Sequence, residues 1–198
     1  MSNIPITSTQ SADVLLHALG EQLAAAGAAF DVVVVGGSAL LVLGLASPAT
    51  KDVDVLAVRA GDALVSADPL PPALVEASGR VARDFALPAD WLNSGPAGLM
   101  DFGLPAGFAE RVEVREYGPA LAVRFASRFD QIHFKPYAAV DASTPGKHAA
   151  DLRELAPTRD ELIAAARWSL THDPSDGCRE MLERALEHFG VEDADLGA

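Results

Sequence analysis

The chain has 198 residues, a hydrophobic content of 49% and a formal net charge of −13 at pH 7. This length can form one domain with a full core, and the acidic balance argues against a generic nucleic-acid-binding protein. The sequence lacks the ~20-residue apolar run of a membrane helix and the basic and apolar regions of a signal peptide. Because Cys178 is its one cysteine, we expect no internal disulfide and a cytoplasmic location.

The first part of the chain predicts a helix followed by two strands. Leucines at three- and four-residue spacing predict a packing helix over residues 11–26, which Gly27 ends. Residues 32–35 are consecutive valines, and so short a β-branched run favours a buried strand over a helix. A second strand is predicted at about residues 52–58, with a turn over residues 59–62.

Between these strands lies Gly36-Gly37-Ser38, followed by a short apolar helix over residues 39–43. Two glycines end the first strand in a turn where the backbone can approach a ligand closely. The start of a helix carries unpaired N–H groups and partial positive charge, which favour a phosphate group. Gly36, Gly37 and Ser38 are therefore predicted to bind a nucleotide through its phosphates.

The second strand carries two carboxylates, Asp52 and Asp54. Residues two apart on a strand share one face, so the two like charges favour a cation that joins them. Mg²⁺ takes one or two carboxylates together with phosphate oxygens, and a pair of such ions can activate a hydroxyl and stabilise pyrophosphate. A solvated acidic strand face is the structural alternative, but Asp is depleted in strands, which favours a metal site.

Two other nucleotide-binding patterns do not fit this stretch. A dinucleotide-binding turn needs Gly-x-Gly-x-x-Gly, and the residues around Gly36 do not have that spacing. A P-loop needs Gly-Lys followed by Ser or Thr, which is absent here.

The rest of the chain predicts a hairpin and a series of helices. Strands over residues 112–116 and 121–125 read as an antiparallel hairpin that extends the sheet. Residues 87–107 are rich in Gly, Pro and Asn and predict a long irregular connection, in which Trp91 is a packing anchor. Helices are predicted over residues 73–85, 127–139, 147–155, 158–170 and 176–189, with a frayed acidic tail from Val191.

These elements indicate an α+β protein, with a mixed sheet flanked by helices and a C-terminal helical part. We place a sheet domain at residues 1–126 and the helical part at residues 127–198, with a single compact unit as the alternative. Residues 111–153 carry seven basic and five acidic side chains, which indicates either a modest anion-binding surface or ordinary exposed charge. Taken alone, Lys135 and Asp151 are expected at the surface.

The stretch from Gly36 to Asp54 resembles the signature of the DNA polymerase β-like nucleotidyltransferase superfamily, Gly-Gly-Ser followed at a distance by Asp-x-Asp. Over about residues 30–155, the chain also resembles the MenT/AbiEii-like toxin nucleotidyltransferases. The matching segments are Val35-Gly-Gly-Ser-Ala-Leu, Thr50-Lys-Asp-Val-Asp, Asp90-Trp-Leu-Asn, a Lys in the helix after the hairpin, and Lys147-x-x-x-Asp-Leu. The chain departs from the family's pattern at Ser47-Pro48, where Arg is common, and at Ser94, where Asp is common.

The resemblance implies a nucleotidyltransferase fold and a Mg²⁺-dependent enzyme. In that family the Gly-Gly-Ser holds the nucleoside triphosphate, the Asp pair binds metal, a later Lys contacts phosphate and a later Asp completes the site. Carried over to this sequence, these roles fall on Gly37, Ser38, Asp52, Asp54, Lys135 and Asp151. The implied reaction moves nucleotides from an NTP to the 3′ end of tRNA and so blocks translation. The protein would be the toxin of a pair, restrained by a cognate antitoxin.

Two alternatives remain open at this level. The acceptor could be a hydroxyl of a protein or of a small molecule such as an aminoglycoside, which the low basic content favours. The chain could also be a non-catalytic module that binds a nucleotide without releasing pyrophosphate. The sequence leaves open which NTP and which tRNA are used.

Overall fold

The computed structural model describes residues 6, 8–45, 50–101, 103–141 and 145–197. Within these ranges, the side chains of residues 137–141 and 145–149 are not described. The protein is α+β, with a mixed open sheet flanked by helices. The chain divides into two compact units, Met1–Leu104 with Phe108–Ala126 and Pro105–Gly107 with Ser127–Ala198. Among the residues described, none of the helices combines the length and the apolar character needed to cross a membrane.

The first unit contains the sheet, whose strands follow the order β3-β2-β1-β6-β5, with β4 paired to β2. β1 runs parallel to β6, and β2 runs parallel to β4, whereas the other neighbouring strands are antiparallel. The expected hairpin is confirmed as β5 and β6. The strands are β1 (Phe30–Val35), β2 (Val53–Ala60), β3 (Ala63–Ser66), β4 (Leu92–Asn93), β5 (Glu113–Glu116) and β6 (Leu121–Phe125).

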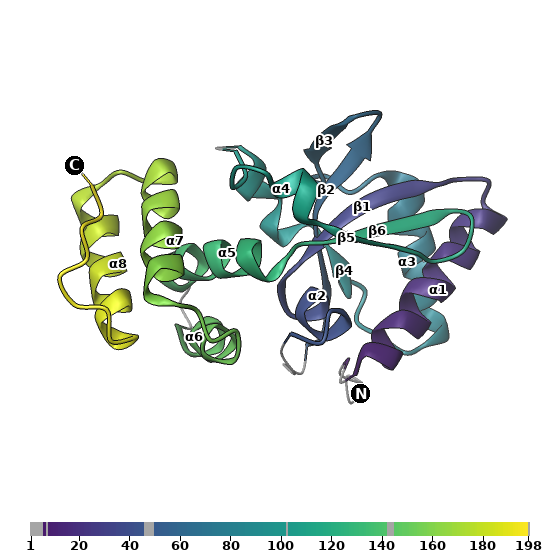
Figure 1. Cartoon of the computed structure of the whole chain (residues 1–198). Coiled ribbons are helices and arrows are strands. Elements are labelled where there is room, and N and C mark those ends of the chain that lie inside the picture. The colour runs from purple at the N-terminus through teal and green to yellow at the C-terminus, as the bar shows by residue number, and fades with distance from the viewer. Residues whose placement is uncertain (1–5, 7, 46–49, 102, 142–144, 198) are drawn as a thin grey trace. The chain divides into compact units, whose positions relative to one another are not determined.

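Helices α1 and α3 lie side by side over one face of this sheet (Figure 1). Their apolar side chains share a core with the strands, and Leu19 of α1, Val81 of α3 and Val55 of β2 are almost completely buried in it. This confirms the packing role expected of the first helix. The helices of the unit are α1 (Thr9–Ala25), α2 (Gly36–Val42), α3 (Pro72–Asp84), the 3₁₀ helix η1 (Gly95–Met100) and α4 (Phe108–Arg111).

The first helix begins two residues earlier than predicted, because Ser8 caps it. The backbone N–H of Ser11 donates to Oγ of Ser8, and the backbone N–H of Ser8 donates to Oγ of Ser11, both at 3.1 Å. This is a capping box in which Ser takes the place of the more usual Glu or Gln. Because Ser11 occupies the position where Glu or Gln is usual, the start of α1 at Thr9 is hard to recognise from the sequence.

Two stretches predicted to be irregular contain secondary structure. Residues 59–62 were expected to form only a turn, but β2 continues to Ala60 and a tight hairpin leads into β3. Gly61 has φ +63°, the conformation that a two-residue hairpin loop requires. The prediction of an irregular connection over residues 87–107 is wrong in part, because this segment contains β4 and η1. A two-residue strand has too few side chains to show an alternating pattern.

The second unit is helical, with α5 (Arg128–Asp141), α6 (Pro145–Glu154), α7 (Arg159–His172) and α8 (Asp176–His188). The predicted capping box at the start of α7 is confirmed, since Thr158 and Glu161 exchange hydrogen bonds. The prediction of a frayed tail is wrong. Val191 and Leu196 are buried, and Arg167 donates to the carbonyl of Asp195 at 2.6 Å.

Candidate nucleotide and metal site

The turn between β1 and α2 brings the backbone against a carboxylate. Gly36 has φ +75°, a conformation that residues with a side chain rarely adopt. A Cβ atom at Gly36 would lie 2.5 Å from Oδ2 of Asp54, closer than real Cβ contacts come. The positive φ angle and the short distance to Asp54 each exclude a residue with a side chain at this position. The group that the backbone approaches here is the Asp54 side chain, and the predicted approach to a ligand stays a prediction.

Helix α2 begins at Gly36, three residues before the predicted start, so Gly37 and Ser38 lie in its first turn. Ser38 is 2% exposed, and its Oγ makes no hydrogen bond to any residue that the structure describes. A buried hydroxyl without a partner costs about 1–3 kcal/mol. Such a group calls for an explanation, and a phosphate bound at this turn would supply the missing acceptor.

The two aspartates sit at the beginning of β2, with Asp52 directly before the strand and Asp54 within it. Val53 and Val55 are 1% and 0% exposed and belong to the core beneath α1 and α3. Since side chains alternate along a strand, Asp54 points away from that core. Both aspartates are half-buried. The predicted alternation is therefore confirmed for Val53, Asp54 and Val55, whereas Asp52 precedes the strand and its place on the same face stays a prediction.

Asp52 is bonded to a residue for which we predicted no role. Oγ1 of Thr50 donates to Oδ1 of Asp52 at 2.8 Å. Thr50 is in turn held by an isolated antiparallel bridge to Ile6. The acceptor lies only two residues along the chain, so this hydrogen bond is a local one.

Strand β4 adds an amide beside the second carboxylate. In the parallel register of β2 and β4, Asn93 lies opposite Asp54, so the two side chains share one face of the sheet. Oδ1 of Asn93 accepts from the backbone N–H of Gly95 at 2.8 Å. Trp91 is completely buried and its indole N–H donates to the carbonyl of Ser78 at 3.0 Å, which confirms it as a packing anchor.

The carboxylate pair fits a magnesium ion better than a metal held by the protein alone. Within the described part of the chain, no group of three or more His, Cys, Asp and Glu side chains is placed to hold a metal. Mg²⁺ commonly takes only one or two carboxylates and fills its other positions with water and substrate phosphate oxygens. Asp52 and Asp54, together with the Gly36 turn and the buried Ser38 hydroxyl, match the needs of a Mg²⁺–nucleotide complex.

Lys135 of α5 and Asp151 of α6 belong to the second unit, where they form an ion pair with each other. Their side chains are 6% and 5% exposed, so the surface positions expected from the local pattern are wrong. Each supplies the partner that a buried charge requires. Lys147 and Ser47-Pro48 lie outside the residues whose side chains the structure describes. The five other predicted site residues all belong to the first unit.

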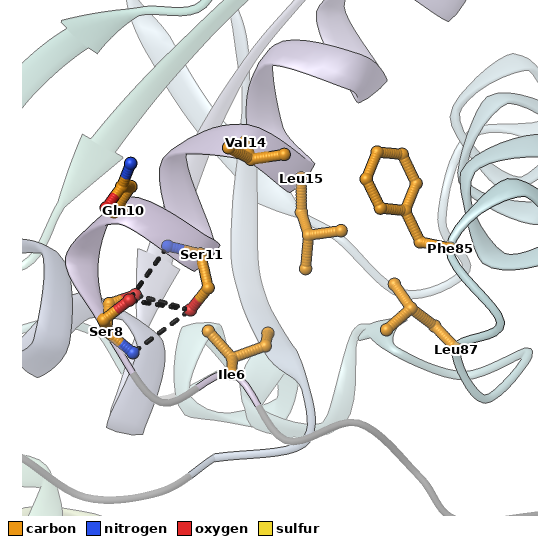
Figure 2. A pocket seen from close by; sticks show the side chains of 8 residues that line it. All are labelled: Ile6, Ser8, Gln10, Ser11, Val14, Leu15, Phe85 and Leu87. Carbon is orange, nitrogen blue, oxygen red and sulfur yellow. Dashed lines mark hydrogen bonds between the residues drawn. The ribbon is translucent and has the colours of Figure 1, made fainter.

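An apolar cavity of about 350 Å³ lies elsewhere in the first unit, at the N-terminal end of α1 (Figure 2). Figure 2 shows Val14 and Leu15 of α1 facing Phe85 and Leu87, which follow α3. None of the side chains that line it is charged, so the cavity is unsuited to a triphosphate. Its lining residues are Ile6, Ser8, Gln10, Ser11, Val14, Leu15, Phe85 and Leu87.

No protein-family model, curated protein or solved structure matches this chain.

Proposed function

We propose that the chain is a Mg²⁺-dependent nucleotidyltransferase with the fold of the DNA polymerase β-like superfamily. The supporting observation is the contact between the Gly36 turn and the Asp54 carboxylate, with the Ser38 hydroxyl buried in the same turn. The site thus combines a glycine turn whose backbone lies close to a carboxylate with a hydroxyl donor in the same turn. Backbone N–H groups at a helix start favour a phosphate, and carboxylates favour the Mg²⁺ that accompanies a triphosphate.

In the proposed reaction, Asp52 and Asp54 would hold Mg²⁺, and the bound ion would supply charge neutralisation for the triphosphate and favour ionisation of the attacking hydroxyl. The backbone of Gly37 and the hydroxyl of Ser38 hold the triphosphate in line with the acceptor. The acceptor oxygen forms a bond to the α-phosphorus, the bond from that phosphorus to the bridging oxygen breaks, and pyrophosphate leaves. The proton of the acceptor hydroxyl passes to a carboxylate or to water.

Lys135 and Asp151 enter the proposal through the family resemblance. Lys135 would orient the triphosphate, and Asp151 would assist metal binding or proton removal. The two side chains are bonded to each other within the second unit. Any test must separate this function from the stability that the pair provides.

The proposed acceptor is the 3′ end of tRNA, which would make the protein a translation-blocking toxin restrained by a cognate antitoxin. The net charge of −13 favours a second candidate, the same transfer to a hydroxyl of a protein or small molecule. Neither acceptor alters the roles of Asp52 and Asp54. A nucleotide-binding module without transfer activity is the non-enzymatic alternative.

Incubation with total tRNA, Mg²⁺ and each α-labelled NTP in turn tests the proposal. Label should move to tRNA with the unmutated protein, and transfer should fall by at least ~100-fold in Asp54→Ala, because the variant loses a metal ligand. Unimpaired transfer by Asp54→Ala would contradict the proposal. Pyrophosphate release without labelled tRNA would indicate another acceptor, and NTP binding without pyrophosphate release would indicate the binding module.

A further inference from the structure

Thr50 is a buried hydroxyl group at the edge of the carboxylate pair. The residue is 1% exposed, so bulk water cannot serve as its hydrogen-bond partner. Its backbone is fixed by the bridge to Ile6, in which N–H of Ile6 donates to the carbonyl of Thr50 at 2.8 Å and N–H of Thr50 donates back at 3.2 Å. The backbone of Thr50 is therefore fixed by the fold itself.

The Thr50 hydroxyl has one proton and two oxygens of Asp52 within reach. Oγ1 lies 2.8 Å from the carboxylate oxygen Oδ1 and 3.3 Å from the main-chain carbonyl oxygen. The carboxylate is both nearer and charged, so it is the stronger acceptor. This bond uses one lone pair of Oδ1 and limits the rotation of the side chain, so it fixes the directions in which the remaining lone pairs of the carboxylate can meet a cation.

The two carboxylates of the pair are held in different ways. Asp54 lies inside β2, paired with Val35 on one side and Asn93 on the other, and its Oδ2 rests against the Gly36 turn. Asp52 precedes β2, so strand pairing does not fix it in the same way. The hydroxyl of Thr50 compensates for that difference.

We infer that Thr50 is the positioning residue of the metal site, which acts by orienting Asp52 toward the cation that Asp52 and Asp54 share. This inference rests on the proposed function, because it presupposes that the carboxylate pair binds a divalent cation. Groups that orient metal ligands typically contribute 10–100-fold to metal affinity. A purely structural hydroxyl would contribute to folding stability alone.

The test compares Thr50→Val, which keeps the shape and loses the hydroxyl, with Thr50→Ser, which keeps the hydroxyl. Binding of Mn²⁺ alone is followed by electron paramagnetic resonance in 0.15 M KCl, with Asp52→Asn and Asp54→Asn defining the specific component. Thermal unfolding of every variant is recorded in parallel. Ser78→Ala is the matched control, because Ser78 is 3% exposed and its hydroxyl donates to the carbonyl of Val75 at 2.9 Å, within α3.

We expect Thr50→Val to weaken specific Mn²⁺ binding by roughly 10-fold or more, and Thr50→Ser to remain within about 3-fold of the unmutated protein. Ser78→Ala should lose stability without losing Mn²⁺ affinity. Unchanged Mn²⁺ binding by Thr50→Val, in a protein whose binding Asp54→Asn abolishes, would overturn the inference and leave the proposed function intact. Equal losses in Thr50→Val and Thr50→Ser would also overturn it. Unchanged Mn²⁺ binding by both aspartate variants would instead overturn the metal site itself.

Discussion

At the level of single residues, the buried hydroxyl of Ser38 has no hydrogen-bond partner among the described residues. Replacing it by a hydrogen atom removes a desolvation cost of about 1–3 kcal/mol from the folded protein. We therefore expect Ser38→Ala to unfold at the same or a higher temperature than the unmutated protein. If the hydroxyl serves a phosphate, the same variant should bind NTP about 10-fold more weakly.

Thermal unfolding and equilibrium NTP binding on the same preparation check this prediction. A loss of more than ~1 kcal/mol of stability with unchanged NTP affinity would assign the Ser38 hydroxyl to the fold instead. Ala39 is completely buried in the same helix, so Ala39→Gly is a useful contrast. It should lose stability, because glycine within a helix costs about 0.5–1 kcal/mol relative to alanine.

The ion pair of Lys135 and Asp151 calls for a double substitution. Lys135→Met leaves the buried Asp151 carboxylate without its cation, which should cost about 3–5 kcal/mol, whereas Lys135→Met combined with Asp151→Leu should recover most of that loss. Urea unfolding of both variants measures the difference. A folded double variant that retains full transfer activity would remove both residues from the proposed catalytic site.

At the level of secondary-structure elements, the packing of α1 depends on a glycine. A Cβ atom at Gly20 would lie 1.9 Å from the carbonyl oxygen of Tyr117, which follows β5. Gly20→Ala should therefore force the helix away from the β5–β6 connection and lower the free energy of unfolding by about 1–3 kcal/mol or more.

Gly79 in α3 is the matched control, since an added Cβ would meet only the Arg83 side chain, at 3.9 Å. Gly79→Ala should raise the free energy of unfolding by about 0.5–1 kcal/mol, because glycine is a poor helix former. Urea unfolding checks both substitutions. Equal effects at Gly20 and Gly79 would show that helix propensity, and not the contact with Tyr117, decides the outcome.

The start of α7 is joined to α5 by a charged pair. Arg128 donates to Glu161 at 2.6 Å, and these hydrogen bonds, with the backbone N–H of Thr158, lower the pKa of Glu161 to about 2 from the ordinary value of 4.5. Because the pKa of Glu161 is lower in the folded state, its ionised carboxylate stabilises the fold at pH values above the ordinary pKa of 4.5. This contribution disappears as the pH falls from 4.5 towards 2.

Comparison with Glu161→Gln isolates this contribution. The unmutated protein should be more stable by about 1–2 kcal/mol at pH 7, a figure reduced for partial solvent screening. The difference should be constant down to about pH 5 and should shrink towards pH 3. Urea unfolding across this range measures it, and a difference that does not change with pH would contradict the lowered pKa.

At the level of the whole molecule, the acidic net charge means that the candidate acceptors predict different salt dependences. A protein with a net charge of −13 can bind RNA only through a local basic surface, and such binding weakens steeply as salt rises. If tRNA is the acceptor, the apparent KM for tRNA should rise at least ~10-fold between 50 and 200 mM KCl. Turnover of a small acceptor should change far less. A flat salt profile with tRNA would point away from an RNA acceptor.

The amino-acid sequence by itself determined most of the local structure and the core of the candidate site. The valine run of β1, the alternation around Asp54 and the capping box at Thr158 are local patterns, and each is confirmed because neighbouring residues decide it. The acidic pair and the glycine turn were predictable for the same reason. Their nucleotidyltransferase role remains a prediction.

Only the tertiary structure decided which distant residues meet. The bridge from Ile6 to Thr50, the register of Asn93 beside Asp54 and the burial of Lys135 against Asp151 join positions far apart in the chain. No local periodicity encodes such contacts, because strand order and helix packing are set by how the whole core is buried. The bond from Thr50 to Asp52 is local, but the tertiary bridge to Ile6 fixes the backbone from which Thr50 makes it.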